Sequence, residues 1–331
     1  MKQSSECVVI KGVGSYVPER VLTNDDLSTM MDTSDEWIRT RTGIRERRIA
    51  ADYEATSDLC ARAAQLALED AKIGAADIDL IILGTLSPDM LIPATAMFVQ
   101  RKLGMEGIPC FDFGAACSGF QYGLEIARTM LLSPQYKNIL LICGDKLSSI
   151  IDWQDRSTCI LFADGAGAVV LSREPAGQPG VIDVLLGSNG EHSDILNIPA
   201  GGSREPASER TIRERKHYLR MDGREVFRLA VQKMGESMGK ILERNNLTIN
   251  EISHVVTHQA NVRIMHAIAE RLRIPMEKVC ITLDKFGNTS ASSIILAIDH
   301  HRRQGIISPG ELILTGGFGA GLTWGAAIIR L

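Results

Sequence analysis

The second half of this 331-residue chain repeats the pattern of its first half. In each half, an apolar strand is followed by a turn of small or polar residues that opens an apolar helix, and further strands come after it. The first copy runs through residues 78–83, Cys117 and residues 140–144, and the second runs through residues 252–257, Asn288 and residues 312–316. The interval from strand to helix start is 39 residues in the first copy (117 − 78) and 36 in the second (288 − 252). This agreement indicates a duplicated α/β unit with pseudo-twofold symmetry.

Cys117 and Asn288 occupy equivalent helix starts in the two copies, so both are expected to face a shared centre. Ligands in α/β folds tend to bind at such strand-to-helix turns. The polar, Pro- and Gly-rich residues 173–180 are the expected linker. We therefore predict an N-terminal half over residues 1–174 and a C-terminal half over residues 175–331. A second polar segment, residues 201–216, is expected at the surface.

The other elements are predicted from hydrophobic periodicity and turn residues. Residues 8–10 form a predicted strand that leads into a turn at residues 12–14, and residues 24–26 form a predicted helix cap. Helices are predicted over residues 57–72, 95–103 and 118–132, and strands over residues 111–114, 139–144 and 167–171.

The charge balance and the cysteines exclude several classes of protein. The chain has 36 Lys+Arg and 40 Asp+Glu, a net charge of −4, whereas a dedicated nucleic-acid binder needs a basic surface. No apolar run reaches the roughly 18 residues that span a bilayer, and residues 1–6 lack the apolar core of a secretory signal. Seven scattered cysteines without a C-x-x-C pair favour reduced thiols. We expect a cytoplasmic protein that binds neither nucleic acid nor membrane.

Cys117 is the first candidate for chemistry. It follows a strand and begins an apolar helix, where the helix dipole would lower the pKa of the thiol and favour the thiolate. Its small neighbours would allow a substrate to approach the backbone closely. The alternative, a buried structural cysteine, is about equally plausible on chemistry alone, and it is the interpretation we give to Cys110, Cys143 and Cys159.

Two further polar residues lie at element ends. His258 ends a buried strand, where site residues are common, although a structural histidine that packs a turn is equally plausible. Asn288 would be an ordinary helix N-cap if the repeat did not pair it with Cys117. His254 is expected in the core or between strands, and His300-His301 on a solvated helix face. No cysteine or histidine spacing matches a zinc site.

Two clusters have ligand-binding and structural interpretations. The glycine-rich residues 316–321 are a weak match to a phosphate loop, because no Lys-Ser/Thr follows, and they would suit backbone N–H donors to an oxyanion. Five arginines beside Trp37 suit a phosphorylated adenine ligand, or a solvated loop with ion pairs. These arginines are Arg39, Arg41, Arg45, Arg47 and Arg48.

Several segments together match one family along essentially the whole chain. The chain resembles the β-ketoacyl-acyl-carrier-protein synthase III family, the initiating condensing enzymes of bacterial fatty-acid synthesis. The matching segments are residues 33–38 (TSDEWI), 41–47 (RTGIRER), 115–120 (AACSGF), 221–227 (MDGREVF), 258–261 (HQAN), 287–290 (GNTS) and 319–325 (GAGLTWG).

The resemblance implies a thiolase fold, a duplicated five-layered αβαβα sandwich, and usually a homodimer. It implies a Cys117 nucleophile with His258 and Asn288, and an oxyanion hole made by the backbone N–H groups of Cys117 and Ala320. The other implied contacts are coenzyme A at Trp37, Arg41 and Arg156, the acyl pocket at Ile92 and Phe318, and carrier-protein docking at Arg228, Arg263 and Arg271.

The implied reaction joins an acyl-CoA primer to malonyl-acyl-carrier protein by decarboxylative condensation, through an acyl-enzyme at Cys117 and without a metal or bound cofactor. Related enzymes differ at single positions: elongating synthases have a second histidine in place of Asn288, and thiolases have a second cysteine that residues 316–321 lack. Ile92 stands where well-studied members carry Phe, so longer or branched primers would fit. Glu270 replaces a basic residue of some members.

Two alternatives remain. The first is a paralogue of secondary metabolism that loads or transfers unusual acyl groups. The second is a non-catalytic protein that binds CoA or an acyl carrier, which the complete set of Cys117, His258 and Asn288 disfavours.

Overall fold

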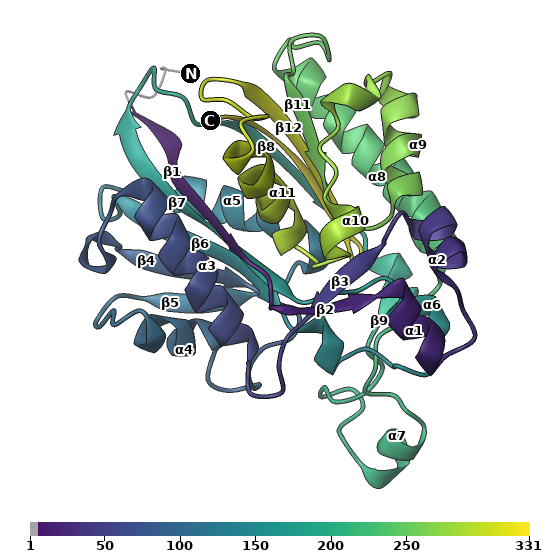
Figure 1. Cartoon of the computed structure of the whole chain (residues 1–331). Helices are drawn as coiled ribbons and strands as arrows, with labels where there is room; N and C mark the ends of the chain where they lie inside the picture. Colours follow the sequence, from purple (N-terminus) through teal and green to yellow (C-terminus); the bar gives the residue numbers. More distant parts are fainter. Residues whose placement is uncertain (1–5) are drawn as a thin grey trace.

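The computed structural model describes residues 6–331 and contains two larger sheets (Figure 1). In the first sheet, the parallel strands β5, β4 and β6 are followed by β7 and β1, each antiparallel to its neighbour. The bounds in sheet order are β1 (Glu6–Tyr16), β7 (Gly165–Pro175), β6 (Asn138–Asp145), β4 (Leu80–Gly84) and β5 (Cys110–Phe113).

The second sheet reproduces this order with the second half of the chain. Strands β11 and β12 are parallel, while β13 and β8 each run antiparallel to the strand before them. Val279 makes an isolated parallel bridge to Val255, at the place that β5 occupies in the first sheet. The predicted duplication is confirmed. The bounds are β11 (His254–Thr257), β12 (Leu312–Gly319), β13 (Thr323–Arg330) and β8 (Val181–Ser188).

Helices complete five layers. The central layer, α5 (Gly119–Leu131) and α11 (Ser292–Arg303), lies between the two sheets, and its apolar side chains share one core cluster with both of them. Helices α3 (Thr56–Ala71) and α4 (Thr95–Lys102) cover the outer face of the first sheet, and α8 (Gly223–Arg244) and α9 (Val262–Leu272) cover that of the second. The predicted sandwich is therefore observed.

Smaller elements pack beside the layers around a core that includes Leu22, Ile38 and Phe162. Helix α1 has Thr23 as its N-cap, paired with Asp26 in a capping box, one residue before the predicted cap. The bounds are β2 (Arg20–Thr23), α1 (Asn24–Met30), α2 (Asp35–Thr42), β3 (Glu46–Ile49), α6 (Arg156–Cys159), β9 (Leu196–Asn197), β10 (Arg220–Met221) and α10 (Leu283–Phe286). Short 3₁₀ turns are η1 (Ala75–Asp77), η2 (Ala116–Ser118), η3 (Leu147–Ser149), η4 (Gly190–His192) and η5 (Met276–Lys278).

The predicted turn at residues 12–14 is wrong, because β1 continues through it. Gly12 and Gly14 serve a close approach instead: a Cβ at either position would lie 2.3 Å from a backbone atom of Ala67 in α3. Glycine there lets the helix pack directly on the strand, and the register shift between Ile10 and Gly12 is a bulge within β1.

The prediction of a solvated face at His300-His301 is wrong for His301. Helix α11 is covered by both sheets, so Asp299 and His301 are buried, and only His300 is partly exposed. Asp299 accepts a hydrogen bond from Ser15 Oγ at 2.6 Å, and His301 Nδ1 lies 2.8 Å from Ala297 O. His254 lies partly buried at the start of β11, 3.0 Å from Glu311.

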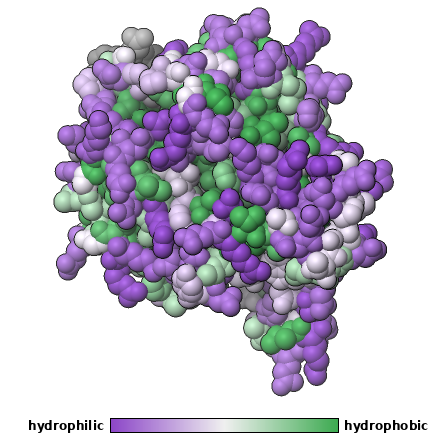
Figure 2. Space-filling model, in the orientation of Figure 1, coloured by the Kyte–Doolittle hydropathy of each residue, from purple (hydrophilic) through white to green (hydrophobic). Residues whose placement is uncertain are grey.

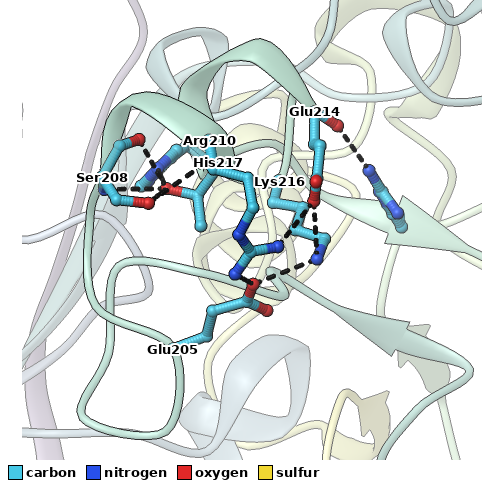
Figure 3. A network of polar contacts seen from close by, with 8 residues as sticks. Glu205, Ser208, Arg210, Glu214, Lys216 and His217 are labelled. Atoms are coloured by element: carbon cyan, nitrogen blue, oxygen red, sulfur yellow. Dashed lines mark hydrogen bonds and ion pairs between the residues drawn. The ribbon is translucent and has the colours of Figure 1, made fainter.

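Residues 201–216 lie at the surface as predicted, and they contain α7 (Glu209–Arg213), which projects from the molecule (Figure 1). Figure 3 shows ion pairs within this projecting segment. Glu205 contacts Arg210 at 2.7 Å and Lys216 at 3.0 Å, and Lys216 also contacts Glu214 at 2.8 Å. The face of the molecule shown in Figure 2 is mainly hydrophilic. Hydrophobic groups also lie on the projecting segment of residues 201–216, where Ile212 is 64% exposed.

The expected linker is shorter than predicted, because β7 runs to Pro175 and β8 begins at Val181. A boundary between residues 174 and 175 remains our proposal for the two halves. Within residues 6–331, no helix combines the length and hydrophobicity needed to cross a membrane.

Candidate active site

A mainly apolar cavity of about 100 Å³ brings the main candidates together. The cavity is lined by Cys117, His258 and Asn288, three residues that are far apart in the sequence, and also by Phe318. The three residues are only 7%, 3% and 5% exposed, so water is largely excluded from them. Hydrogen bonds and charges in such a site act in a lower effective dielectric than at the surface.

The backbone around Cys117 forms a sharp turn between β5 and α5. Ala116 adopts the left-handed conformation with φ of 47°, which is uncommon for a residue with a Cβ and turns the chain just before Cys117. Gly319 of β12 approaches from the opposite side, and a Cβ there would lie 2.5 Å from Cys117 N. Glycine at position 319 is therefore a steric requirement of the Cys117 turn.

The lowered pKa predicted for Cys117 is wrong. The pKa of the thiol is raised to about 12, mainly because the thiol is buried; hydrogen bonding with Ser290 opposes this rise, and the charge of Asp145 adds to it. Desolvation of a thiolate in an apolar cavity thus outweighs the helix terminus. Cys117 therefore carries its proton at neutral pH.

His258 is held at the end of β11 with one ring nitrogen engaged. Its backbone N–H donates to Gly316 O at 2.7 Å, and its Nδ1 lies 2.8 Å from Ser293 Oγ. The Ser293 hydroxyl also accepts from Gln259 N at 3.1 Å. The Ser293 contact engages Nδ1, and the imidazole also makes a hydrogen bond with the Ser290 backbone. Burial lowers the pKa of His258 to about 4, so the imidazole is neutral at pH 7.

Asn288 is not the N-cap of α11, whose N-cap is Ala291. Its backbone is tied to the strand-like segment before β7, because Asn288 N donates to Leu161 O at 3.0 Å and Ala163 N donates to Asn288 O at 2.9 Å. The side-chain Oδ1 accepts from Ser290 N at 2.9 Å. The amide nitrogen Nδ2 is therefore the side-chain atom left to donate to a ligand.

Most of the glycine-rich segment belongs to a strand and not to a phosphate loop, because β12 extends to Gly319. Thr323 fixes the residue after this strand: its hydroxyl lies 3.1 Å from Ala320 O and 2.9 Å from Ala115 O. The Ala320 segment and the Cys117 turn are thereby held side by side, as an oxyanion hole from their two amides would require.

Trp37, Arg41 and Arg156 meet outside the cavity. Both guanidinium carbons lie 4.6 Å from the centre of the Trp37 ring. Asn261 lines the cavity and donates to Arg41 O at 3.1 Å, which connects this cluster with the cavity.

Arg47 does not join this cluster, although the sequence grouped it there. It is completely buried, donates to Leu22 O, Ile160 O and Asn24 Oδ1, and its pKa is lowered by burial to about 10. The arginine-rich segment is thus partly structural.

The remaining predicted residues are dispersed. Ile92 does not line the cavity of this chain and is 86% exposed. Arg228 is exposed and paired with Glu225 at 2.8 Å, and Arg271 lies 4.0 Å from Glu236. Arg263 lies 5.9 Å from the ring centre of Phe227, which lines the cavity. In the part of the chain that the structure describes, no group of three or more His, Cys, Asp or Glu side chains is arranged to hold a metal ion.

Sequence reasoning missed four residues that support the site. Ser293 orients His258, Thr323 joins two turns, and Ser290 and Asp145 influence the Cys117 thiol. The available signal was polarity in an apolar context: Asp145 ends a buried strand, and the two serines open a buried helix.

Family comparisons identify both halves of the site. Residues 111–190 match the model described as 3-Oxoacyl-[acyl-carrier-protein (ACP)] synthase III, and residues 242–331 match the model of its C-terminal part. A β-ketoacyl-[acyl-carrier-protein] synthase III of Caldanaerobacter subterraneus subsp. tengcongensis is 49% identical over 97% of each chain.

Solved structures extend the likeness to the whole fold. The synthase III of Aquifex aeolicus VF5 is 44% identical with a TM-score of 0.90, and the match covers 98% of this chain and all of that one. The synthase III of Pseudomonas aeruginosa PAO1 is 42% identical with a TM-score of 0.91 over 98% of each chain. The predicted duplicated sandwich of the thiolase type is confirmed.

Proposed function

This chain belongs to the β-ketoacyl-[acyl-carrier-protein] synthase III family, and we propose that Cys117, His258 and Asn288 carry out the reaction of that family here. The activity is the decarboxylative condensation of an acyl-CoA primer with malonyl-acyl-carrier protein, which initiates fatty-acid synthesis. The observation that supports these residue roles is their meeting in one water-poor cavity.

In the first half-reaction, Cys117 Sγ attacks the acyl-CoA carbonyl carbon. The backbone N–H groups of Cys117 and Ala320 donate to the oxyanion of the tetrahedral intermediate. The bond to the coenzyme A sulfur then breaks, coenzyme A leaves as a thiol with a proton equivalent to the one that Cys117 has lost, and an acyl thioester remains on Cys117.

In the second half-reaction, malonyl-carrier protein enters the space that coenzyme A has left. His258 Nε2–H and Asn288 Nδ2–H donate to its thioester carbonyl, and this stabilises the enolate that forms as carbon dioxide leaves. The enolate carbon attacks the acyl carbon on Cys117, the Cys117 thiolate leaves and takes up a proton from water, and the 3-oxoacyl product departs on the carrier protein. A neutral His258 suits this donor role, and the proposed mechanism uses no metal and no bound cofactor.

Intact-protein mass spectrometry with acyl-CoAs from acetyl to dodecanoyl tests the proposal. We expect a mass increase of one acyl group, which malonyl-carrier protein discharges to a 3-oxoacyl product. Acylation that malonyl-carrier protein cannot discharge would instead support the acyl-transferring paralogue, which the matched relatives do not favour.

We propose that Trp37, Arg41 and Arg156 bind the adenine nucleotide of coenzyme A. Trp37→Ala should raise the KM for acyl-CoA about tenfold with little change in kcat, because stacking of a base on an aromatic ring contributes about 1–3 kcal/mol. Steady-state kinetics would measure this. An acyl thioester that lacks the nucleotide is the matched control, and an equal loss with it would contradict the assignment.

We propose that Arg228, Arg263 and Arg271 dock the acidic carrier protein. Arg263→Glu should raise the KM for malonyl-carrier protein about tenfold, and the effect should shrink in high salt because exposed charges are screened. Arg62→Glu is the matched control, since Arg62 also stacks on a ring, 5.0 Å from the centre of Tyr16, but on α3. Equal effects of the two variants would count against a docking role.

We also propose a cytoplasmic homodimer. Met90, Leu91 and Ile92 form an exposed apolar run, 48%, 84% and 86% exposed, that a second copy would cover. Ile92 could then border the acyl pocket only through that second copy. Sedimentation of the purified chain as a monomer at micromolar concentration would exclude this arrangement.

A further inference from the structure

Arg47 is a buried cation that the proposed mechanism does not use. It lies on β3 and is completely buried. Its Nη1 donates to Leu22 O at 3.2 Å and to Asn24 Oδ1 at 2.9 Å, and its Nη2 donates to Ile160 O at 2.8 Å. All three acceptors are neutral oxygens, and Nε has no hydrogen-bond partner. Removing a guanidinium from water to meet neutral acceptors is costly, so this arrangement calls for an explanation.

The guanidinium of Arg47 holds residues 160–163, the segment that is paired with Asn288. Nη2 donates to the first carbonyl of this segment. The next carbonyl, Leu161 O, accepts from Asn288 N at 3.0 Å, and Ala163 N donates to Asn288 O at 2.9 Å. A displacement of this segment would therefore move the backbone of Asn288 with it.

The aliphatic stem of Arg47 borders the turn directly before Asn288. This turn needs glycine, because Gly287 has φ of 66°, in the left-handed region. A Cβ at Gly287 would lie 3.1 Å from the Cβ atoms of both Arg47 and Ala163. Arg47 therefore lies against both of the segments whose pairing places Asn288: its stem borders the turn, and its guanidinium holds the paired segment.

The side chain of Asn288 depends on this backbone position. Its Oδ1 accepts from Ser290 N at 2.9 Å, which orients the amide, and Asn288 lines the cavity with Cys117. In the proposed mechanism, Nδ2–H donates to the thioester carbonyl of malonyl-carrier protein. Such a donor stabilises the enolate only at hydrogen-bond distance, and a misplacement of about 1 Å can lower a rate about 100-fold.

A second buried side chain holds Arg47 from the opposite side. Asn24 is buried, and its Nδ2 donates to Asp35 Oδ1 at 2.9 Å and to Ile44 O at 2.8 Å. These two bonds fix the orientation of the amide, so that its Oδ1 accepts from Arg47 Nη1. The guanidinium is thus anchored on residues that do not line the active-site cavity.

We propose that Arg47 is a positioning residue that places the Asn288 amide for decarboxylation of malonyl-carrier protein. The inference rests on the proposed function, in which Asn288 donates to the developing enolate. Arg47 acts through residues 160–163 and the turn at Gly287, and it does not line the cavity itself. Acylation of Cys117 uses backbone donors and does not require this placement.

The test is the second half-reaction, measured per acylated protein. Each variant is first acylated on Cys117 by acyl-CoA and then mixed with malonyl-carrier protein, and the carbon dioxide and 3-oxoacyl product of a single turnover are measured. Intact-protein mass spectrometry gives the acylated fraction, and normalising to it removes any effect of lower stability. Arg47→Met should lower the normalised rate about 100-fold, while acylation at saturating acyl-CoA should stay within about threefold of wild type.

A conservative variant and a control separate positioning from a general disturbance. Arg47→Lys should lose only about tenfold, because the ammonium keeps a donor for Ile160 O, and it carries the same comparison if Arg47→Met does not fold. Arg48→Met is the matched control and should decarboxylate at the wild-type rate. Arg48 lies on the same strand and also has a buried Nε without a partner, but its guanidinium contacts Pro18 O at 3.4 Å and Glu46 at 3.7 Å.

Double variants identify the group through which Arg47 acts. Combined with Asn288→Ala, Arg47→Met should add no further loss, because its effect passes through Asn288. Combined with His258→Ala, it should add its own loss, since His258 is held separately by Gly316 and Ser293.

Three results would overturn the positioning role and leave the condensing function intact. These are wild-type decarboxylation in the Arg47 variants, an equal loss of acylation, and a further loss when Arg47→Met is added to Asn288→Ala. Failure of the proposed function would look different: Asn288→Ala alone would decarboxylate at the wild-type rate per acylated protein, or Cys117→Ala would still accept an acyl group.

Discussion

Replacing Cys117 by alanine is expected to abolish acylation of the protein and to lower condensation by at least about 10⁴-fold, the scale on which removal of a nucleophile acts. No other cysteine can substitute for it, because Cys117 is the cysteine that lines the cavity with His258 and Asn288. Intact-protein mass spectrometry after incubation with acyl-CoA measures the first effect, and release of 3-oxoacyl product measures the second.

Cys143→Ala provides the matched control for this experiment. Cys143 is completely buried within β6, and burial raises the pKa of its thiol as it does for Cys117, but it does not line the cavity. This variant should still be acylated once per chain. An acylated Cys117→Ala protein would refute the assignment of the nucleophile.

His258→Ala is expected to separate the two half-reactions. Decarboxylation of malonyl-carrier protein should fall about 10³-fold, because one of the two donors to the developing enolate is lost. Acylation of Cys117 should stay within about threefold of wild type, since the first step uses backbone donors. Single-turnover acylation and release of labelled carbon dioxide would measure the two steps independently.

His254→Ala is the control for that variant, since His254 begins the strand that His258 follows but contacts Glu311 at 3.0 Å and does not line the cavity. Equal losses in both half-reactions of His258→Ala would show a general disturbance of the site. The wild-type pH profile adds a check: burial lowers the pKa of His258 from 6.5 to about 4, so its protonation should cause no loss of activity near pH 6.5. The unfolded state takes up this proton more readily than the folded state does. The free energy of unfolding therefore decreases as pH falls from 6.5 toward 4.

The central architecture was predictable because it depends on repeated local patterns. Apolar runs predicted β4, β6, β11 and β12, and their similar spacing predicted the duplication that places Cys117 opposite Asn288. Errors arose where packing against a distant element decides the outcome. Gly12 and Gly14 looked like a turn, but α3 packs on them, and His301 looked solvated, but β-sheets cover its helix from both sides.

The family, the two-sheet fold and the three residues that meet at the centre could all be predicted from the sequence, because motif order and hydrophobic periodicity are local properties of the chain. The chemical state of these residues could not be predicted in the same way, because it depends on the tertiary structure. Burial keeps Cys117 protonated and His258 neutral. Desolvation and proximity depend on what surrounds a residue in space, which neighbouring positions in the sequence do not specify.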